Sequence, residues 1–217
     1  MIQSIRPKNI VITGPNSGNV RTSVLKTIQS IAPQYMTMRS VTTCEKSVIG
    51  EKAEFYTRVT RKEFRLYHGE GKLFAGTFLG EHRMFAILKE EYEQSINSEI
   101  PFIVRLDFNG IKDLYRYHSL EELKDQFCIV ALMPSMTSRR EAMQYNGVPH
   151  QEALQRIQTT ELTEQNFFRT DRRAECITGT VNAISRESNF LPLAESIVEY
   201  STGKTERLII PKSFTFQ

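Results

Sequence analysis

The sequence predicts a protein of the α/β class with a parallel sheet at its core, and two observations support this prediction. Short apolar runs, typical of buried strands, alternate along the chain with segments of helical character, as in a parallel sheet covered on both faces. The first of these runs ends at Gly14 and is followed by a loop of small and polar residues and then by a helix. A chain of 217 residues is long enough for one such domain with insertions or for two small lobes.

The segment Lys8–Ser30 has the order of a phosphate-binding loop, or P-loop: a strand, a loop, a basic residue, a hydroxyl and a helix. Backbone N–H groups in a tight loop, together with the positive end of a helix, form a cradle for phosphate oxygens. Arg21 would neutralise the phosphates, and the hydroxyl of Thr22 or Ser23 could hold Mg²⁺. This pattern predicts a nucleotide site at the start of the chain.

The segment also departs from the standard P-loop spacing. Arg21 replaces the usual Lys, Val20 replaces the second Gly, and the loop is one residue longer. A β-branched residue such as Val20 does not easily adopt a positive φ or allow a close backbone approach. The alternative is an ordinary β–loop–α connection in which Ser17 or Asn19 helps to start the helix.

Composition narrows the class of protein. Charged residues make up 24% and hydrophobic residues 40% of the chain, and the net charge of +3 is too small to indicate a nucleic-acid partner. Three cysteines lie far apart without metal-ligand spacing, which favours a reduced, cytoplasmic protein (Cys44, Cys128 and Cys176). No stretch has the length and apolarity of a signal peptide or a membrane span, so we expect no membrane partner.

The rest of the chain divides into further strands and helices. We expect a second strand over 35–43, a half-exposed strand over 55–60 and a glycine-punctuated hairpin near 73–87. Apolar strands are predicted at 101–107 and 127–133, and a final strand near 176–178. Helical segments are predicted near 61–67, 89–96, 138–168 and 191–200, with a break at 146–149. The tail after residue 202 either adds an edge strand or packs on the surface.

From about Asn9 to about Leu162 the order of motifs resembles guanylate kinase and its relatives. The motifs are ITGPNSG, RTS, RSVTT, the glycine-rich hairpin, LDFNG and MPS, of which Ser40–Thr43 and Leu106–Gly110 are the best. The resemblance implies a P-loop core of three layers around a parallel sheet, a small mixed lobe that binds a nucleoside monophosphate, and a helical lid. We assign residues 1–38, 91–136 and 161–217 to the core, 39–90 to the lobe and 137–160 to the lid.

The resemblance also implies roles for individual residues. Arg21 and Asp107 would serve catalysis, Asp107 near the acceptor and the metal, while a capping role for Asp107 at the following helix is the alternative. Lid arginines would close over the phosphates, although a solvated helix face is the alternative for them (Arg139, Arg140 and Arg156). ATP with Mg²⁺ at Thr22 would be surrounded by nine residues (Gly14, Pro15, Asn16, Ser17, Gly18, Asn19, Val20, Thr22 and Ser23). The acceptor would contact four more (Arg39, Ser40, Thr43 and Arg58).

The acceptor lobe departs from the family pattern. Cys44–Ser47 replaces a segment with two arginines that grip the monophosphate, and Ala75 replaces the carboxylate that reads guanine. Specificity for GMP is therefore not expected. Two functions follow: a diverged kinase that transfers a phosphoryl group from ATP to a nucleoside monophosphate or similar acceptor, or an inactive module on the same fold that binds a nucleotide or a protein partner.

Overall fold

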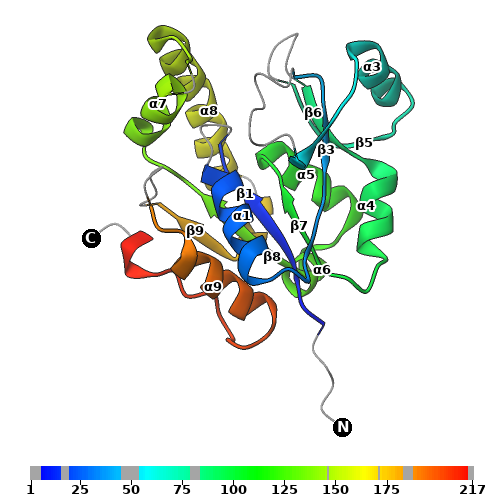
Figure 1. The fold of residues 1–217 in the computed structure, drawn as a ribbon, viewed down its shortest axis with the longest axis vertical. Coiled ribbons are helices and arrows are strands. Elements are labelled where there is room, and N and C mark those ends of the chain that lie inside the picture. The colour runs from blue at the N-terminus through cyan, green and yellow to red at the C-terminus, as the bar shows by residue number, and fades with distance from the viewer. Residues whose placement is uncertain are drawn as a thin grey trace.

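A five-stranded sheet forms the core of the protein, in a computed structural model that describes residues 6–15, 20–44, 54–78, 84–145, 147–170, 172–182 and 188–214. All its strand pairs are parallel and the order is β2–β7–β1–β8–β9 (Figure 1). The strands are β1 (Asn9–Thr13), β2 (Met36–Thr37), β7 (Phe102–Arg105), β8 (Phe127–Leu132) and β9 (Gly179–Val181). Every residue of β1 and β8 is buried, as in a sheet covered on both faces. The predicted α/β class is confirmed.

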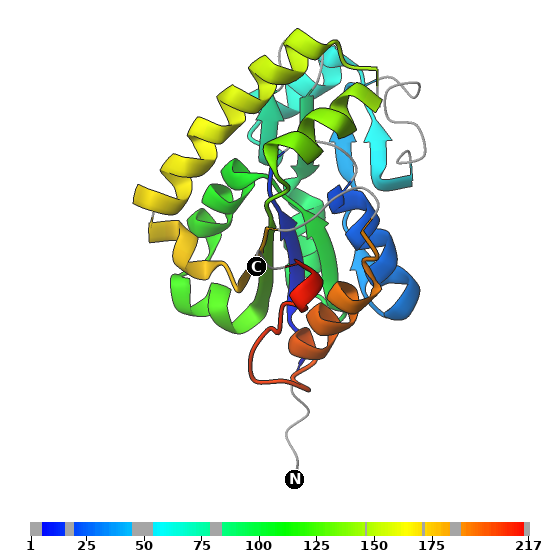
Figure 2. The ribbon, with the colours of Figure 1, turned by 90° about the vertical axis from the view of Figure 1, so that its left-hand side faces the viewer.

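Helices cover both faces of the core sheet, so the protein has three layers (Figure 2). On one face, α1 (Val20–Ile31) and α9 (Leu191–Ser201) pack against alternate strand residues such as Ile10 and Ile12. On the other face, Val11 packs in a cluster with apolar residues of four α-helices. These are α4 (Lys89–Ile96), α5 (Phe108–Tyr117), α6 (Leu120–Gln126) and the end of α8 (His150–Thr170).

A second sheet, called the small sheet below, has four strands in the order β4–β3–β6–β5. They are β3 (Ser40–Thr42), β4 (Tyr56–Arg58), β5 (Leu73–Phe78) and β6 (Met84–Leu88). The β3–β4 pair is parallel and the other two pairs are antiparallel, so the predicted mixed lobe is confirmed. Helix α3 (Arg61–Gly69) buries Phe64 against this sheet and begins with a capping box formed by Thr60 and Glu63. Helix α4 (Lys89–Ile96) follows β6.

Two helices form the predicted lid region. Helix α7 (Met136–Tyr145) packs on the first half of α8 through Met143, Ala153 and Ile157. Helix α8 continues without a break past residue 160, and its Phe167 stacks on Phe108 of α5 in the core. Figure 1 shows α7 and the first part of α8 on one side of the molecule and the small sheet on the other, both beyond the carboxyl ends of the core strands.

Two details of the sequence prediction change. Residues 35–43 are not one strand, because the chain leaves the core sheet after β2 and enters the small sheet at β3. The local sequence does not show which partner strand each half will pair with, and this is why the prediction was wrong. The expected strand at 176–178 is the 3-10 helix η2 (Arg172–Cys176) followed by β9.

The described part of the tail packs against the core. Phe214 of the 3-10 helix η3 (Lys212–Phe214) is buried and stacks on Phe190 beside α9. Leu208 also lies close to Gly179 of β9, where a Cβ atom would come within 2.7 Å of its side chain. Of the two alternatives left by the sequence, the tail packs on the surface of the core. Among the described residues, no helix has the length and hydropathy needed to cross a bilayer.

Candidate functional site

The strand order places a candidate binding site at the carboxyl ends of β1 and β8. These strands are neighbours in the sheet, but the connection from β1 runs towards β2 and the connection from β8 runs towards β9, on opposite sides. Such a reversal leaves a crevice outside the carboxyl ends of parallel strands, where ligands of α/β proteins usually bind. The P-loop pattern begins at this point.

Gly14 brings the backbone after β1 close to the end of β8. Its φ is +137°, and a Cβ atom added there would lie 2.2 Å from the carbonyl oxygen of Leu132. Only glycine combines this conformation with this close approach. Pro15 follows and is buried. The next four predicted loop residues, 16–19, lie outside the described residues.

The first turn of α1 places two predicted site residues in the core. Val20 is 7% exposed and packs with Val24 and Ile28 on the buried face of the helix. This burial gives Val20 a packing role where a standard P-loop has its second glycine. Ser23 is partly buried, and its carbonyl oxygen accepts a hydrogen bond from Thr27 Oγ1 at 3.0 Å, as in a regular helix.

Thr13, the last residue of β1, carries a hydroxyl with unused hydrogen-bonding capacity. The residue is completely buried, and its Oγ1 has no hydrogen-bond partner among the described residues. Buried hydroxyls in proteins almost always have a partner, which is often a water or a ligand. Within the described residues, the hydroxyl is therefore a polar group at the end of β1 for which a ligand or a water could serve as the partner.

Arg105 at the end of β7 reaches the start of α1. Its Nη1 donates a hydrogen bond of 2.8 Å to Thr22 Oγ1, and Thr22 itself is buried. The Arg105 guanidinium also lies 5.0 Å from the ring centroid of Phe55 and 4.9 Å from that of Tyr56. Both distances allow cation–π attraction, which holds the guanidinium in place.

Arg21 lies beside this arrangement. Its Nη1 donates a hydrogen bond of 2.7 Å to the carbonyl oxygen of Leu106. Burial lowers the pKa of the Arg21 guanidinium, an effect that the Asp107 carboxylate opposes and the nearby Arg105 guanidinium reinforces. Arginine stays charged under such conditions, so two cations lie close together here. We call this set the guanidinium junction (Arg21, Thr22, Phe55, Tyr56 and Arg105).

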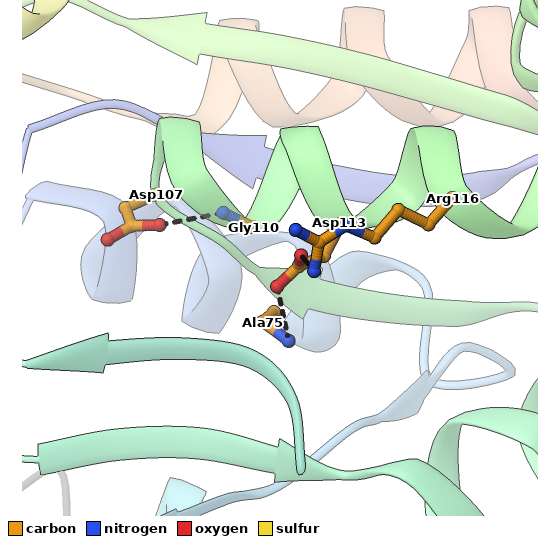
Figure 3. Close-up of polar contacts among 5 residues, drawn as sticks. All are labelled: Ala75, Asp107, Gly110, Asp113 and Arg116. Carbon is orange, nitrogen blue, oxygen red and sulfur yellow. Dashed lines mark hydrogen bonds and ion pairs between the residues drawn. The ribbon is translucent and has the colours of Figure 1, made fainter. Parts of the chain in front are cut away.

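Asp107 has both carboxylate oxygens engaged by the protein. Its Oδ1 accepts a hydrogen bond of 2.8 Å from the backbone N–H of Gly110, which makes Asp107 the N-cap of α5 (Figure 3). Its Oδ2 accepts a hydrogen bond of 2.6 Å from Thr77 Oγ1 on β5. The capping alternative for this residue is therefore the arrangement observed.

Asp113, two turns along α5, makes a second contact with β5. Its Oδ2 accepts from the Ala75 backbone N–H at 3.1 Å, and its Oδ1 accepts from Arg116 Nη1 at 2.7 Å (Figure 3). Ala75 has φ +55° within a β-bulge, and a Cβ atom on Gly110 would lie 3.2 Å from its methyl group. We call this set the carboxylate junction (Ala75, Thr77, Asp107, Gly110 and Asp113).

The residues present do not fit a Mg²⁺ ion at Thr22. P-loop proteins hold this ion with the hydroxyl at that position and with a carboxylate on a neighbouring strand. Here the Thr22 hydroxyl accepts from a cation, Arg105, and both oxygens of Asp107 are engaged. Within the described ranges, no group of three or more His, Cys, Asp or Glu side chains could hold a metal ion.

The lid arginines differ in their surroundings. Arg139 is 5% exposed, and its Nε donates a hydrogen bond of 2.7 Å to the carbonyl oxygen of Pro134 at the joint between β8 and α7. Arg140 is partly exposed. Arg156 lies on α8, and its side chain is outside the described part of the structure. Of these three, Arg139 is placed to stabilise the joint.

The predicted acceptor residues mainly support the small sheet. Arg39 donates from its backbone N–H to Glu91 Oε1 at 3.0 Å and from Nη2 to the carbonyl oxygen of Tyr56 at 2.8 Å. Thr43 Oγ1 accepts from the backbone N–H of Met84 at 3.1 Å. Ser40 is partly buried and Arg58 is exposed (β3 and β4).

The sequence did not indicate five residues of the two junctions as site residues (Phe55, Tyr56, Thr77, Arg105 and Asp113). The available signal for Arg105 was its place at the end of an apolar strand two residues before Asp107. Nothing in the local pattern connects it with Thr22, which is 83 positions away. Such a contact arises only when β7 pairs with β1.

A solved kinase structure has a similar fold. The chain is similar to the guanylate kinase from Anaplasma phagocytophilum with a TM-score of 0.54 and 17% identity, over 94% of this chain and 88% of that chain. A gluconokinase from Sinorhizobium meliloti 1021 has a TM-score of 0.47 and 17% identity, over 92% of this chain and 93% of that chain. A shikimate kinase from Acinetobacter baumannii has a TM-score of 0.47 and 12% identity, over 92% of this chain and 96% of that chain. Both similarities are too weak to carry an argument. No model of a protein family and no curated protein matches the sequence. The likeness supports a fold of the P-loop kinase type, without singling out the guanylate kinases.

Proposed function

We propose that this chain binds a nucleotide through its phosphate groups at the carboxyl ends of β1 and β8, as a binding module that does not transfer a phosphoryl group. The observation that carries the proposal is the guanidinium junction. Arg105 contacts Thr22 in the first turn of α1, and Arg21 lies beside it on the same turn. Guanidinium groups and a helix N-terminus both favour phosphate as the ligand.

Two further features support a phosphate ligand at this place. Gly14 brings the backbone after β1 close to β8, as a loop that encloses a ligand requires. Thr13 has a buried hydroxyl at the same strand end that lacks a partner among the described residues. Both features lie at the strand ends where the connections run apart.

We propose that no phosphoryl group is transferred because residues that a kinase would use for transfer are engaged in other contacts or are missing. Phosphoryl transfer depends on a metal ion that neutralises the phosphates and on residues that orient the acceptor. Here Asp107 caps α5 and holds Thr77, and Arg139 is buried against Pro134. The acceptor segment Cys44–Ser47 also lacks the two arginines of the family pattern.

The second candidate is a kinase for a nucleoside monophosphate or a similar acceptor. One observation favours it: α7 and α8 and the small sheet lie on opposite sides beyond the carboxyl ends of the core strands (Figure 1). Two ligands could meet between them, as transfer requires. The choice between the candidates depends on whether the acceptor reacts.

Calorimetric titration of the purified chain with ATP, ADP and GMP tests the proposal. We expect binding of ATP and ADP, and no ADP formation when ATP is mixed with a panel of monophosphates. Arg21→Ala should weaken ATP binding by about tenfold or more, because a charge-assisted hydrogen bond to phosphate is lost. Arg65→Ala, on the exposed surface of α3, is the matched control. Absence of ATP binding contradicts the proposal, and ADP formation with a monophosphate establishes the kinase.

A further inference from the structure

We infer that the phosphates are held without a divalent cation, because the guanidinium of Arg105 takes the place at Thr22 where a P-loop protein holds Mg²⁺. This inference rests on the proposed function and adds the chemical form of the ligand. The ligand is a metal-free nucleoside diphosphate or triphosphate, or another polyphosphate chain. The first step of the argument is the Thr22 hydroxyl, whose oxygen accepts from Arg105 Nη1 at 2.8 Å.

A metal ion at this hydroxyl would have to displace the guanidinium. Mg²⁺ binds oxygen ligands at about 2.1 Å, which would place a doubly charged ion directly beside the positive charge of Arg105. Like charges at such a distance repel strongly in a partly buried site. The same oxygen would also need to exchange its hydrogen bond with Arg105 for the metal contact.

Arg105 is fixed in this position by more than one contact. The rings of Phe55 and Tyr56 both lie within cation–π distance of its guanidinium. Its backbone is held in β7, where Arg105 pairs with Ile12 of β1. Moving the guanidinium away from Thr22 would sacrifice these ring contacts, so the cation is a built part of the site.

The second ligand that a metal would need is also replaced. In P-loop proteins the end of a neighbouring strand supplies a carboxylate to the ion. In this chain that strand end carries Arg105, which reverses the charge. The next carboxylate, Asp107, is held by the Gly110 N–H and by Thr77 Oγ1.

The two guanidinium charges therefore do the neutralising work of the ion. Arg105 lies close enough to Arg21 to act on its charge, and Asp107 offsets part of the charge of Arg21. A phosphate chain placed against them completes the charge balance. A divalent cation in solution competes with the protein for the same phosphate oxygens, so Mg²⁺ should weaken binding or leave it unchanged.

The test is a calorimetric titration of the full chain with ATP and with inorganic tripolyphosphate, once with Mg²⁺ and once with excess EDTA. We expect the Kd in EDTA to be equal to that in Mg²⁺ or lower. Binding that weakens by about tenfold or more in EDTA overturns this inference and leaves the proposed function standing. Binding of neither probe in either solution overturns both the inference and the proposed function.

A variant assigns the effect to Arg105. Arg105→Gln keeps a donor for Thr22 and removes the charge, and we expect metal-free binding of tripolyphosphate to weaken by about tenfold. Arg65→Gln on α3 is the control, with unchanged binding expected. Unchanged binding in a folded Arg105→Gln protein overturns the role of Arg105. Should this variant fail to fold, the comparison of Mg²⁺ with EDTA on the wild-type chain still decides the inference.

Discussion

The carboxylate junction and the guanidinium junction tie opposite edges of the small sheet to the core. At the β5 edge, Asp107 at the N-cap of α5 and Asp113 within α5 accept hydrogen bonds from Thr77 and Ala75 respectively. At the β4 edge, the Arg105 guanidinium lies against the ring of Tyr56. Carboxylates therefore join the small sheet to the core at one edge, and a guanidinium group joins it at the other.

Under the function proposed above, the difference explains how a fold of the P-loop kinase type could hold phosphates without a metal ion. Carboxylates at the carboxyl end of β7 are engaged in holding α5 and β5 together. The guanidinium groups face the start of α1, where phosphates are expected. The Asp107 carboxylate is occupied by hydrogen bonds within the protein, whereas the guanidinium groups of Arg21 and Arg105 lie at the strand ends, where they could attract an anion.

The largest effect on the free energy of unfolding is expected from a substitution at Gly14, because the geometry of the strand ends depends on this residue. Gly14→Ala places a Cβ atom 2.2 Å from the carbonyl oxygen of Leu132. We expect a loss of about 3 kcal/mol or more in the free energy of unfolding, because β1 and β8 must separate. Urea denaturation followed by circular dichroism measures this loss.

The control for this prediction is Gly71→Ala. Gly71 also has a positive φ, +66°, but a Cβ atom there meets nothing within 4 Å. We expect a cost of about 1 kcal/mol from backbone strain alone. Equal losses for the two variants would show that the contact with β8 is unimportant.

A smaller effect on the free energy of unfolding is expected from substitutions at Asp107. This residue of the carboxylate junction lies two positions after Arg105 of the guanidinium junction. Asp107→Ala removes the cap of α5 and the bond from Thr77, and should cost about 2 kcal/mol of unfolding free energy. Asp107→Asn retains the cap and should cost less than about 1 kcal/mol. Thermal and urea unfolding of both variants measure these differences.

Ligand binding by Asp107→Asn sharpens the comparison further. The Asp107 carboxylate offsets the charge of Arg21, so its removal should strengthen binding of metal-free ATP by about twofold to threefold. A carboxylate that holds a metal would give the opposite result. Weaker binding of ATP by this variant in EDTA would contradict the division of charge between the junctions.

The smallest effect concerns His118, at the opposite end of α5 from Asp107. Burial lowers the pKa of His118, with Glu122 opposing, and its Nε2 lies 2.5 Å from the Tyr92 hydroxyl. The folded state thus favours neutral His118. As the pH falls below about 6.5, the unfolded chain takes up a proton that the folded chain resists, and the free energy of unfolding decreases.

Urea titrations between about pH 8 and about pH 5.5 measure this decrease. In His118→Gln the pH dependence over this range should become shallower, while the stability at high pH also falls because the Tyr92 contact changes. The matched control is His68→Gln, because His68 lies on the exposed surface of α3. An unchanged pH dependence in His118→Gln would show that this histidine does not contribute.

Much of the fold follows from local patterns in the sequence. Continuous apolar runs predict β1 and β8, since strands buried on both faces carry few polar residues. The Asp107 cap lies within three residues of the N–H that it accepts from, so its alternative role could be stated in advance. Val20 departs from the P-loop pattern in the sequence, and its burial with the core explains why a β-branched residue stands there.

Contacts between distant segments could not be predicted in this way. Residues 35–43 were predicted as one strand, yet β2 and β3 belong to different sheets. The bond from Arg105 to Thr22 spans 83 positions and the bond from Thr77 to Asp107 spans 30. No periodicity or spacing in the sequence indicates that these residues are in contact, because the contacts depend on how the two sheets and α5 pack.

The sequence by itself determined the α/β class, the strand that leads to Gly14 and the helix that carries Arg21 and Thr22. These features depend on propensity, periodicity and glycine geometry, which act over a few residues. The tertiary structure alone decided that a cation lies against Thr22 and that Asp107 serves α5 and β5. The physical reason is that charge at a site depends on which side chains meet in space, and here they come from strands that pair only in the folded protein.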